Sequence, residues 1–142
     1  MIKLLTLGDV VGKAGTELLC GGGLQKLRAR YTPDLVIVNG ENAAEGNGLS
    51  RETAMRLYDA GADVLTLGNH TFGRREICPY LDDCAYILRP ANLAPSLPGR
   101  GWGLFETKIG QVAVVNLIGR CAMDFTPDNP FRLIDRILKD VR

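Results

Sequence analysis

Three glycine-containing turns carry the residues of this chain that could do chemistry. Each turn follows an apolar run, in the stretches LLTLGDVVG, DLVIVNGEN and VLTLGNHTF. The polar residues that these turns present are Asp9, Glu41, Asn42, Asn69 and His70, and His70 is the only histidine in the chain. Because ligands of parallel α/β sheets bind at the carboxyl ends of the strands, the three turns are predicted to meet at one edge of a sheet.

The oxygen atoms of these side chains suit divalent metal ions. Carboxylates and amides bind Mn²⁺ and Mg²⁺ well, and Fe²⁺ is also suitable. Two such ions about 3.5–4 Å apart, joined by a bridging carboxylate, can clamp a phosphate and activate water. A histidine beside them could protonate the leaving oxygen, so His70 is predicted to be a catalytic acid and not a metal ligand.

Each turn also has an ordinary structural explanation when it is taken alone. Asp9 could cap the next helix, because aspartate is favoured at that position. Glu41 and Asn42 could be polar loop residues, Asn69 could occupy a turn with positive φ, and His70 could lie on the surface. Three such turns in succession make the common site the stronger hypothesis.

The pattern of apolar residues predicts strands and helices in alternation, which favours a parallel sheet with right-handed crossovers. We expect the first strand to be buried. We also expect a helical segment that Gly21-Gly22-Gly23 interrupts, and a second helix that Ser50 caps and Gly61 ends. The expected strands cover residues 2–7, 35–38 and 64–67, and the expected helices cover residues 14–30, 50–60 and 74–81. The first helix should place Leu18, Leu19, Leu24 and Leu27 on one side, and the second should turn Ala54, Leu57 and Tyr58 inward.

The second part of the chain has a different pattern. Residues 87–101 are rich in proline and glycine and are expected to form a long loop. Two apolar segments around Ile109-Gly110 predict a β-hairpin, and Pro130 is expected to open a last helix. The whole chain, residues 1–142, is interpreted as part of one domain.

Composition excludes several classes of protein. The chain is 46% hydrophobic and carries 17 basic and 16 acidic residues, so no strong charge favours nucleic acid. No apolar run is long enough to span a membrane and no signal peptide is recognisable, so a cytoplasmic location is expected. The four cysteines form no CxxC pair and are expected to be reduced thiols. GDVVGKAG matches neither GxGxxG nor the P-loop pattern.

Several motifs in order resemble one known family. Six motifs follow one another across nearly the whole chain: GDVVG, NGENAA, GNHTF, RPAN, VAVVNLIGR and DNPF. In this order they resemble the bacterial YmdB-like metallophosphoesterases, a branch of the calcineurin-like phosphoesterase superfamily. The resemblance implies a four-layer α/β sandwich with two metal ions and phosphodiesterase activity on cyclic nucleotides, 2′,3′-cyclic ones among them.

The resemblance also implies a role for each candidate residue. Asp9 would bind the first metal ion, Glu41 would bridge both, Asn69 would bind the second, and Asn42 would belong to the same ligand shell. His70 would be the acid or would stabilise the transition state. Two divalent ions are expected, with Fe²⁺ or Mn²⁺ preferred and Mg²⁺ also suitable.

This chain matches only the amino-terminal half of that family. Family members are about twice as long, and their second half supplies three more metal-binding histidines. We therefore expect half of the sandwich fold, an incomplete two-metal site, an open sheet edge and an uncovered apolar face. A second copy of the chain or a separate carboxyl-terminal half could complete the site. A non-catalytic binding module and an inactive fragment are the alternative hypotheses.

Overall fold

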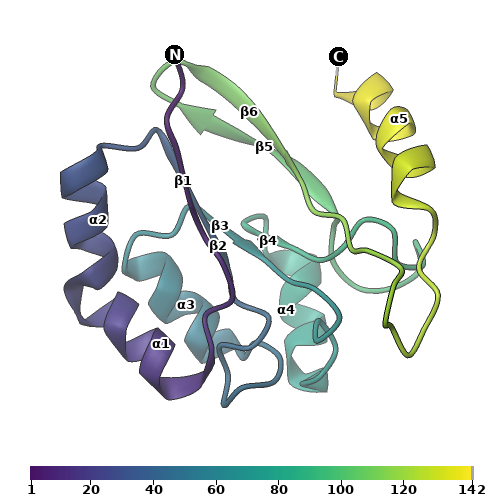
Figure 1. Cartoon of the computed structure of the whole chain (residues 1–142), viewed down its shortest axis with the longest axis horizontal. Coiled ribbons are helices and arrows are strands. Elements are labelled where there is room, and N and C mark those ends of the chain that lie inside the picture. The colour runs from purple at the N-terminus through teal and green to yellow at the C-terminus, as the bar shows by residue number, and fades with distance from the viewer. Residues whose placement is uncertain (142) are drawn as a thin grey trace.

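The computed structural model describes residues 1–141, and its centre is a parallel sheet of four short strands. The strands are β1 (Leu4–Leu7), β2 (Leu35–Asn39), β3 (Val64–Thr66) and β4 (Ile87–Leu88), and they lie side by side in chain order (Figure 1). All neighbouring pairs are parallel. Because every crossover moves in the same direction with the same hand, the helices collect on one face of the sheet.

The covering helices are α1 (Gly12–Leu18), α2 (Leu24–Tyr31), α3 (Arg51–Asp59) and α4 (Cys78–Asp83), the last preceded by a 3₁₀ turn at Arg75–Ile77. Their apolar sides pack on the sheet and form the larger core. Its fully buried members include Leu24, Leu57, Leu81, Val36, Val38, Leu65 and Ile87. The predicted alternation of strands and helices is therefore confirmed.

The three consecutive glycines interrupt the first helical segment as predicted. Residues Leu19–Gly23 form a wide π-type turn, and Gly22 has a φ of 100°, which favours glycine. A Cβ atom on Gly23 would overlap the carbonyl oxygen of Leu18. The predicted placement of Leu18 on one side with Leu19 and Leu24 was wrong, because Leu18 is 71% exposed whereas the other two are buried. The break changes the direction of the helix, so one helical spacing cannot describe both of its parts.

Helix α3 begins as the sequence predicts. The Ser50 hydroxyl accepts a hydrogen bond from the backbone N–H of Thr53 at 3.1 Å. Ala54 and Leu57 are fully buried, but Tyr58 is 48% exposed, so its predicted inward orientation was wrong. Its ring stacks on Tyr86 at the margin of the core, because the next residue after Leu57 lies about 100° further round the helix.

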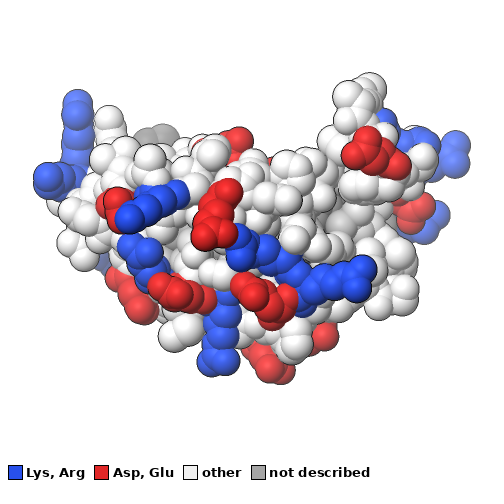
Figure 2. Space-filling model, turned by 90° about the horizontal axis from the view of Figure 1, so that it is seen from below, with Lys and Arg blue, Asp and Glu red and all other residues white. Residues whose placement is uncertain are grey.

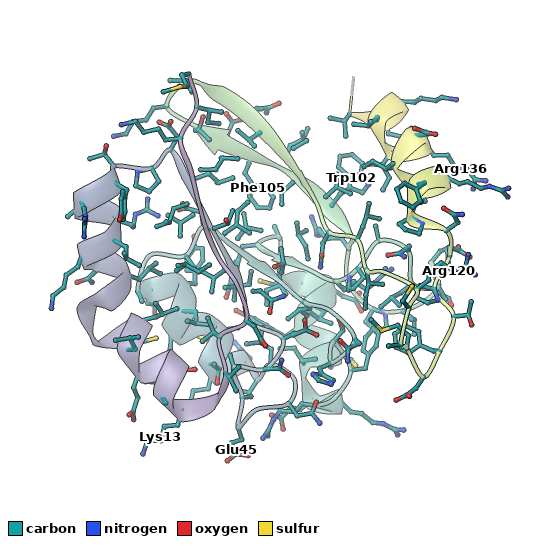
Figure 3. All side chains as sticks on the ribbon, viewed as in Figure 1. Lys13, Glu45, Trp102, Phe105, Arg120 and Arg136 are labelled. Carbon is teal, nitrogen blue, oxygen red and sulfur yellow. The ribbon has the colours of Figure 1, made fainter. Side chains whose placement is uncertain are left out.

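A β-hairpin covers the opposite face of the sheet. Strands β5 (Trp102–Thr107) and β6 (Gly110–Val115) pair antiparallel, which confirms the predicted hairpin, but its turn lies at 108–109, one position before the expected Ile109-Gly110. Phe105 points between the hairpin and the parallel sheet (Figure 3). The second core lies here, with Leu35, Val64, Leu88 and Val114 buried against Ile37, Phe105 and Val112. Helices on one face and a hairpin on the other give the layers of a sandwich.

Two expectations for the strands need correction. Residues 87–101 were expected to be a loop throughout, but Ile87–Leu88 pair with β3 as β4. A strand of only two residues gives no periodic pattern in the sequence, so Ile87–Leu88 are recognised as a strand only by their pairing with β3. Strand β1 was expected to be buried, but it lies at the sheet edge and Leu4 is 49% exposed. None of its residues belongs to the core under the hairpin.

The chain continues to helix α5 (Pro130–Asp140), which begins at the predicted proline. The Asn129 side chain caps it by accepting from the N–H groups of Phe131 and Arg132. Ile137 is buried, whereas Phe131 is 81% exposed. Figure 2 shows basic and acidic side chains interspersed over one face of the molecule, without a large block of either sign.

Two further observations concern the whole described part of the chain. The four cysteines are free thiols, in agreement with the prediction. Within residues 1–141, no helix combines the length and the apolar character that crossing a bilayer requires.

Candidate active site

The three glycine-containing turns meet at the carboxyl edge of the parallel sheet, as the sequence predicts. Backbone hydrogen bonds hold them side by side. The N–H of Val10 donates to the carbonyl of Asn39 at 3.0 Å, and the N–H of Gly40 donates to the carbonyl of Thr66 at 3.0 Å. A third bond, from Gly12 to the carbonyl of Asn42 at 2.8 Å, fixes the first turn against the second.

Asn42 connects the first turn to the third through its side chain. Its Nδ2 atom donates to Asp9 Oδ1 at 2.7 Å, and its Oδ1 atom lies 2.5 Å from His70 Nδ1. A carboxylate only accepts hydrogen bonds, so the amide nitrogen faces Asp9 and the amide oxygen faces His70. The amide oxygen in turn requires a proton on Nδ1 of His70. The hydrogen bonds therefore hold the ring with its Nε2 atom directed away from Asn42.

Asp9 does not cap the following helix. The N-cap of α1 is Val11, and no side chain donates or accepts a capping bond there. Asp9 itself has a φ of 39°, in the region that non-glycine residues seldom adopt. The helix-capping explanation of Asp9 is thus excluded, and the backbone places the carboxylate beside Asn42.

Glu41 is held from two sides. Its Oε2 atom accepts from the backbone N–H of His70 at 3.2 Å, and its Oε1 atom lies 3.4 Å from Asn39 Nδ2. The carboxylate lies against Gly68, where a Cβ atom would overlap it. Glycine at the end of the third strand is therefore needed for the Glu41 carboxylate to approach the His70 turn. Sequence reasoning missed Asn39, whose only signal was its place at the end of the second strand.

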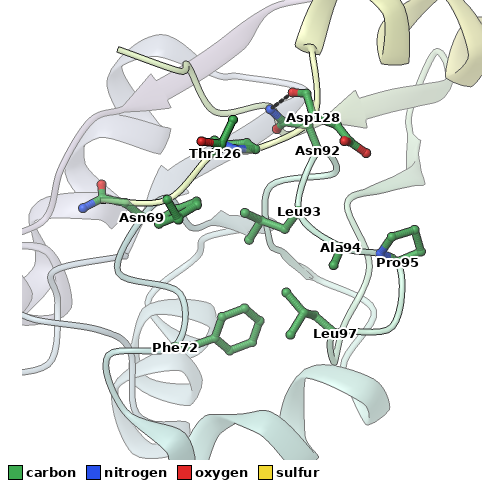
Figure 4. Close-up of a pocket in the computed structure, with 11 residues that line it drawn as sticks. Asn69, Phe72, Asn92, Leu93, Ala94, Pro95, Leu97, Thr126 and Asp128 are labelled. Atoms are coloured by element: carbon green, nitrogen blue, oxygen red, sulfur yellow. Dashed lines mark hydrogen bonds between the residues drawn. The ribbon is translucent and has the colours of Figure 1, made fainter. Parts of the chain in front are cut away.

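Asn69 stands apart from the other four candidates. Its side chain is exposed, and in residues 1–141 no hydrogen bond joins it to Asp9, Glu41, Asn42 or His70. It lies instead at the rim of a neighbouring pocket (Figure 4). Its φ is not positive, so the special turn conformation considered for it is not adopted. His70 is half-buried and not a free surface residue.

The donor set fits divalent cations in part. Asp9 and Glu41 offer two carboxylates, and Asn42 and Asn69 offer amide oxygens, which are ligands of hard cations. Within residues 1–141, however, no three side chains of the His, Cys, Asp and Glu types gather into a metal-binding cluster. The residues present could supply some of the ligands that two ions require, and other groups would have to supply the rest.

Comparison with known proteins identifies the family of the chain. The family model described as YmdB-like protein matches residues 5–142. The chain belongs to the YmdB-like protein family. It is 38% identical, over 141 residues, to a 2′,3′-cyclic-nucleotide 2′-phosphodiesterase of Bacillus subtilis (strain 168). That match covers 98% of this chain and 52% of the relative.

Solved structures of similar proteins share the fold. A protein of Thermus thermophilus superposes with a TM-score of 0.89 at 38% identity, covering 98% of this chain and 53% of that one. A structure described as a novel phosphatase, from Mycoplasma pneumoniae, gives a TM-score of 0.89 at 34% identity and covers 99% and 52%. The chain thus spans about half the length of the relatives and solved structures that it matches.

Proposed function

We propose that this YmdB-like chain takes part in the hydrolysis of a phosphodiester at a metal-dependent site. The observation that carries the proposal is the connection of Asp9 to His70 through the Asn42 amide. This connection joins the carboxylate of Asp9, a side chain of a type that binds metal ions, to His70, the proposed proton donor, at one edge of the sheet. The similarity to a phosphodiesterase and to a phosphatase supports the same reaction class.

The proposed substrate is a cyclic nucleotide, either 2′,3′-cyclic or 3′,5′-cyclic. Support for this finer assignment comes from the Bacillus subtilis relative, which is a 2′,3′-cyclic-nucleotide 2′-phosphodiesterase.

Asp9, Glu41, Asn42 and Asn69 would hold two divalent cations in this proposal, with Fe²⁺ or Mn²⁺ preferred and Mg²⁺ also suitable. When bound, such cations neutralise the charge of the phosphodiester and supply the Lewis acidity that attack by water requires. Glu41 has a carboxylate fixed by Asn39 and by the His70 backbone, so it is suited to face both cations. The remaining ligands would come from a carboxyl-terminal half or from another subunit.

His70 is the proposed acid. Its Nδ1 proton is engaged by Asn42, which leaves Nε2 as the atom that can carry a proton toward the leaving oxygen. In the protonated imidazole both nitrogen atoms are donors. Transfer of the Nε2 proton to the leaving oxygen would neutralise the alkoxide as the P–O bond breaks, and Nδ1 would keep its bond to Asn42 throughout.

A non-catalytic binding role is the second candidate. The described residues contain no cluster of three titratable metal ligands, and this favours a half-domain that holds a nucleotide or a partner through its open sheet edge without catalysis. Metal-dependent binding of the phosphodiester distinguishes the two candidates. It would be lost in Glu41→Ala under the first, whereas under the second the binding of the ligand would persist in both Glu41→Ala and His70→Ala.

Metal content tests the proposal directly. The purified chain is loaded with Mn²⁺ or Fe²⁺ and desalted, and bound metal is measured beside Glu41→Ala. Glu52→Ala is the matched control, because Glu52 is an exposed carboxylate on α3. Metal bound by the chain and by Glu52→Ala but lost in Glu41→Ala is expected.

Hydrolysis is then assayed with bis-p-nitrophenyl phosphate and 2′,3′-cyclic AMP, in the presence of a matching carboxyl-terminal half. Absence of metal and of hydrolysis under these conditions would contradict the proposed function.

A further inference from the structure

A pocket lies beside the proposed site and is formed by chain segments that are far apart in the sequence. It encloses about 550 Å³, within the range of pockets that hold small organic ligands. Phe72 and Leu97 face each other across it, and Leu93 lies between them and the upper rim (Figure 4). Phe125 adds a second aromatic ring to the lining.

The pocket adjoins the proposed site. Asn69 and Phe72 both line it, and they lie on either side of His70 in the same turn. The Thr71 hydroxyl donates to the carbonyl of Gly68 at 2.7 Å and fixes that turn. A ligand that fills the pocket would therefore lie next to the turn that carries His70.

The far wall of the pocket is held by Asn92, which is 1% exposed. Its Nδ2 atom donates to the carbonyls of Ile118 and Asp128 at 2.8 and 2.9 Å, and its Oδ1 atom accepts from the N–H of Ile118 at 2.9 Å. The backbone N–H of Asp128 donates back to the Asn92 carbonyl at 2.8 Å. These bonds use both N–H groups of the amide and one acceptor position of its oxygen, so Asn92 shapes the pocket and has no N–H group left to donate to a ligand.

The chemistry of the lining points to an uncharged planar ligand. No basic residue lies among the described residues that line the pocket, and its one charged side chain is the acidic Asp128. A phosphate group would therefore be disfavoured inside it. Two phenylalanine rings and two leucines instead suit an aromatic ring, which stacks or packs on such side chains.

We propose that this pocket binds the nucleobase of the nucleotide whose phosphodiester lies at the His70 edge. The proposal rests on the proposed function for the position of the phosphate, but base binding itself needs no metal ion. The base gains its binding affinity by stacking on Phe72 and Phe125. Asn69 lies between the base in the pocket and the phosphate at the His70 edge.

The test measures binding of adenosine to the whole chain in EDTA, by saturation-transfer NMR and by titration. Ribose 5-phosphate, which has the phosphate but no base, is the comparison ligand. Phe125→Ala removes an aromatic ring that is 39% exposed and should leave the fold intact. Phe131→Ala is the matched control, because Phe131 is 81% exposed on α5 and does not line the pocket.

Adenosine is expected to bind through its base protons, ribose 5-phosphate is not, and Phe125→Ala should weaken adenosine binding by about tenfold. Phe131→Ala should bind adenosine as the parent chain does. No adenosine binding, or equal binding in Phe125→Ala, would overturn the base pocket. If the chain binds adenosine but takes up no metal in the metal-loading experiment, the base pocket is upheld. Only the proposed phosphodiesterase function is then contradicted.

Discussion

The Nδ1 atom of His70 lies 2.5 Å from the Oδ1 atom of Asn42, although the two residues are 28 positions apart in the chain. Asn42 is itself bonded to Asp9, so a single amide sets the orientation of the only histidine relative to a carboxylate of the first turn. An asparagine in this place does more than offer an oxygen to a cation, because it also fixes which ring nitrogen of His70 is available.

His70→Ala should slow hydrolysis more for a poor leaving group than for a good one. A general acid matters most when the leaving oxygen is strongly basic, so the loss should reach about 10²- to 10⁴-fold with an alkyl leaving group and be much smaller with p-nitrophenolate. The rates are measured with a matching carboxyl-terminal half present. Equal losses for both leaving groups would argue that His70 positions the substrate and does not donate a proton.

Gly68→Ala should damage the site while sparing the fold. The new Cβ atom would overlap only the end of the Glu41 side chain, which can rotate away, so the free energy of unfolding should change by less than about 1 kcal/mol. Bound Mn²⁺ should nevertheless fall to the level of Glu41→Ala. Gly8→Ala is the control, because a Cβ atom on Gly8 meets nothing within 4 Å.

Gly101→Ala provides the contrasting case. There the Cβ atom would overlap the backbone of Ala91, which cannot move aside, so the variant should lose about 1–3 kcal/mol or more of stability. Urea unfolding measures the free energy of unfolding of Gly68→Ala and of Gly101→Ala. If Gly68→Ala proved as destabilising as Gly101→Ala, the explanation based on Glu41 rotation would be wrong.

Asn92→Ala should destabilise the chain by at least about 2 kcal/mol, because it leaves the buried N–H of Ile118 and two carbonyl groups without their partners. Adenosine binding should weaken with it, since the wall near Asp128 loses its anchor. Gln25→Ala, an exposed amide on α2, is the comparison and should change stability by less than about 0.5 kcal/mol. A mild effect of Asn92→Ala on unfolding would contradict the anchoring role.

Stability should fall at alkaline pH through Tyr86. Burial, with the hydrogen bond to Tyr80, holds the pKa of Tyr86 well above its ordinary value. The unfolded chain therefore releases this proton above about pH 10 while the folded chain keeps it, and the free energy of unfolding decreases as the pH rises. The free energy is compared from urea unfolding at about pH 9 and about pH 11.

Tyr86→Phe should show a smaller fall over the same interval. The comparison is made in a Cys20→Ala background, because burial also raises the pKa of the Cys20 thiol and adds a loss of the same sign. An identical fall with tyrosine and with phenylalanine at position 86 would show that other groups cause the alkaline loss.

The sequence by itself determined the local features of this protein. The glycine break at Gly22, the Ser50 cap and the three turns after apolar strands follow from the conformational preferences of a few neighbouring residues. The parallel arrangement follows as well, since alternating strands and helices have few other solutions. For that reason the order of the strands and turns along the chain is enough to place Asp9, Asn42 and His70 at one edge of the sheet.

Tertiary structure alone decided what depends on segments far apart in the chain. Strand β4 exists only as a partner of β3, and Leu4 is exposed because the core under the hairpin does not extend over β1. The hydrogen bond from the His70 backbone to the Glu41 carboxylate and the pocket wall that Asn92 holds were equally hidden. Pairing and packing depend on long-range contacts, and such contacts leave no periodic pattern in the residues that make them.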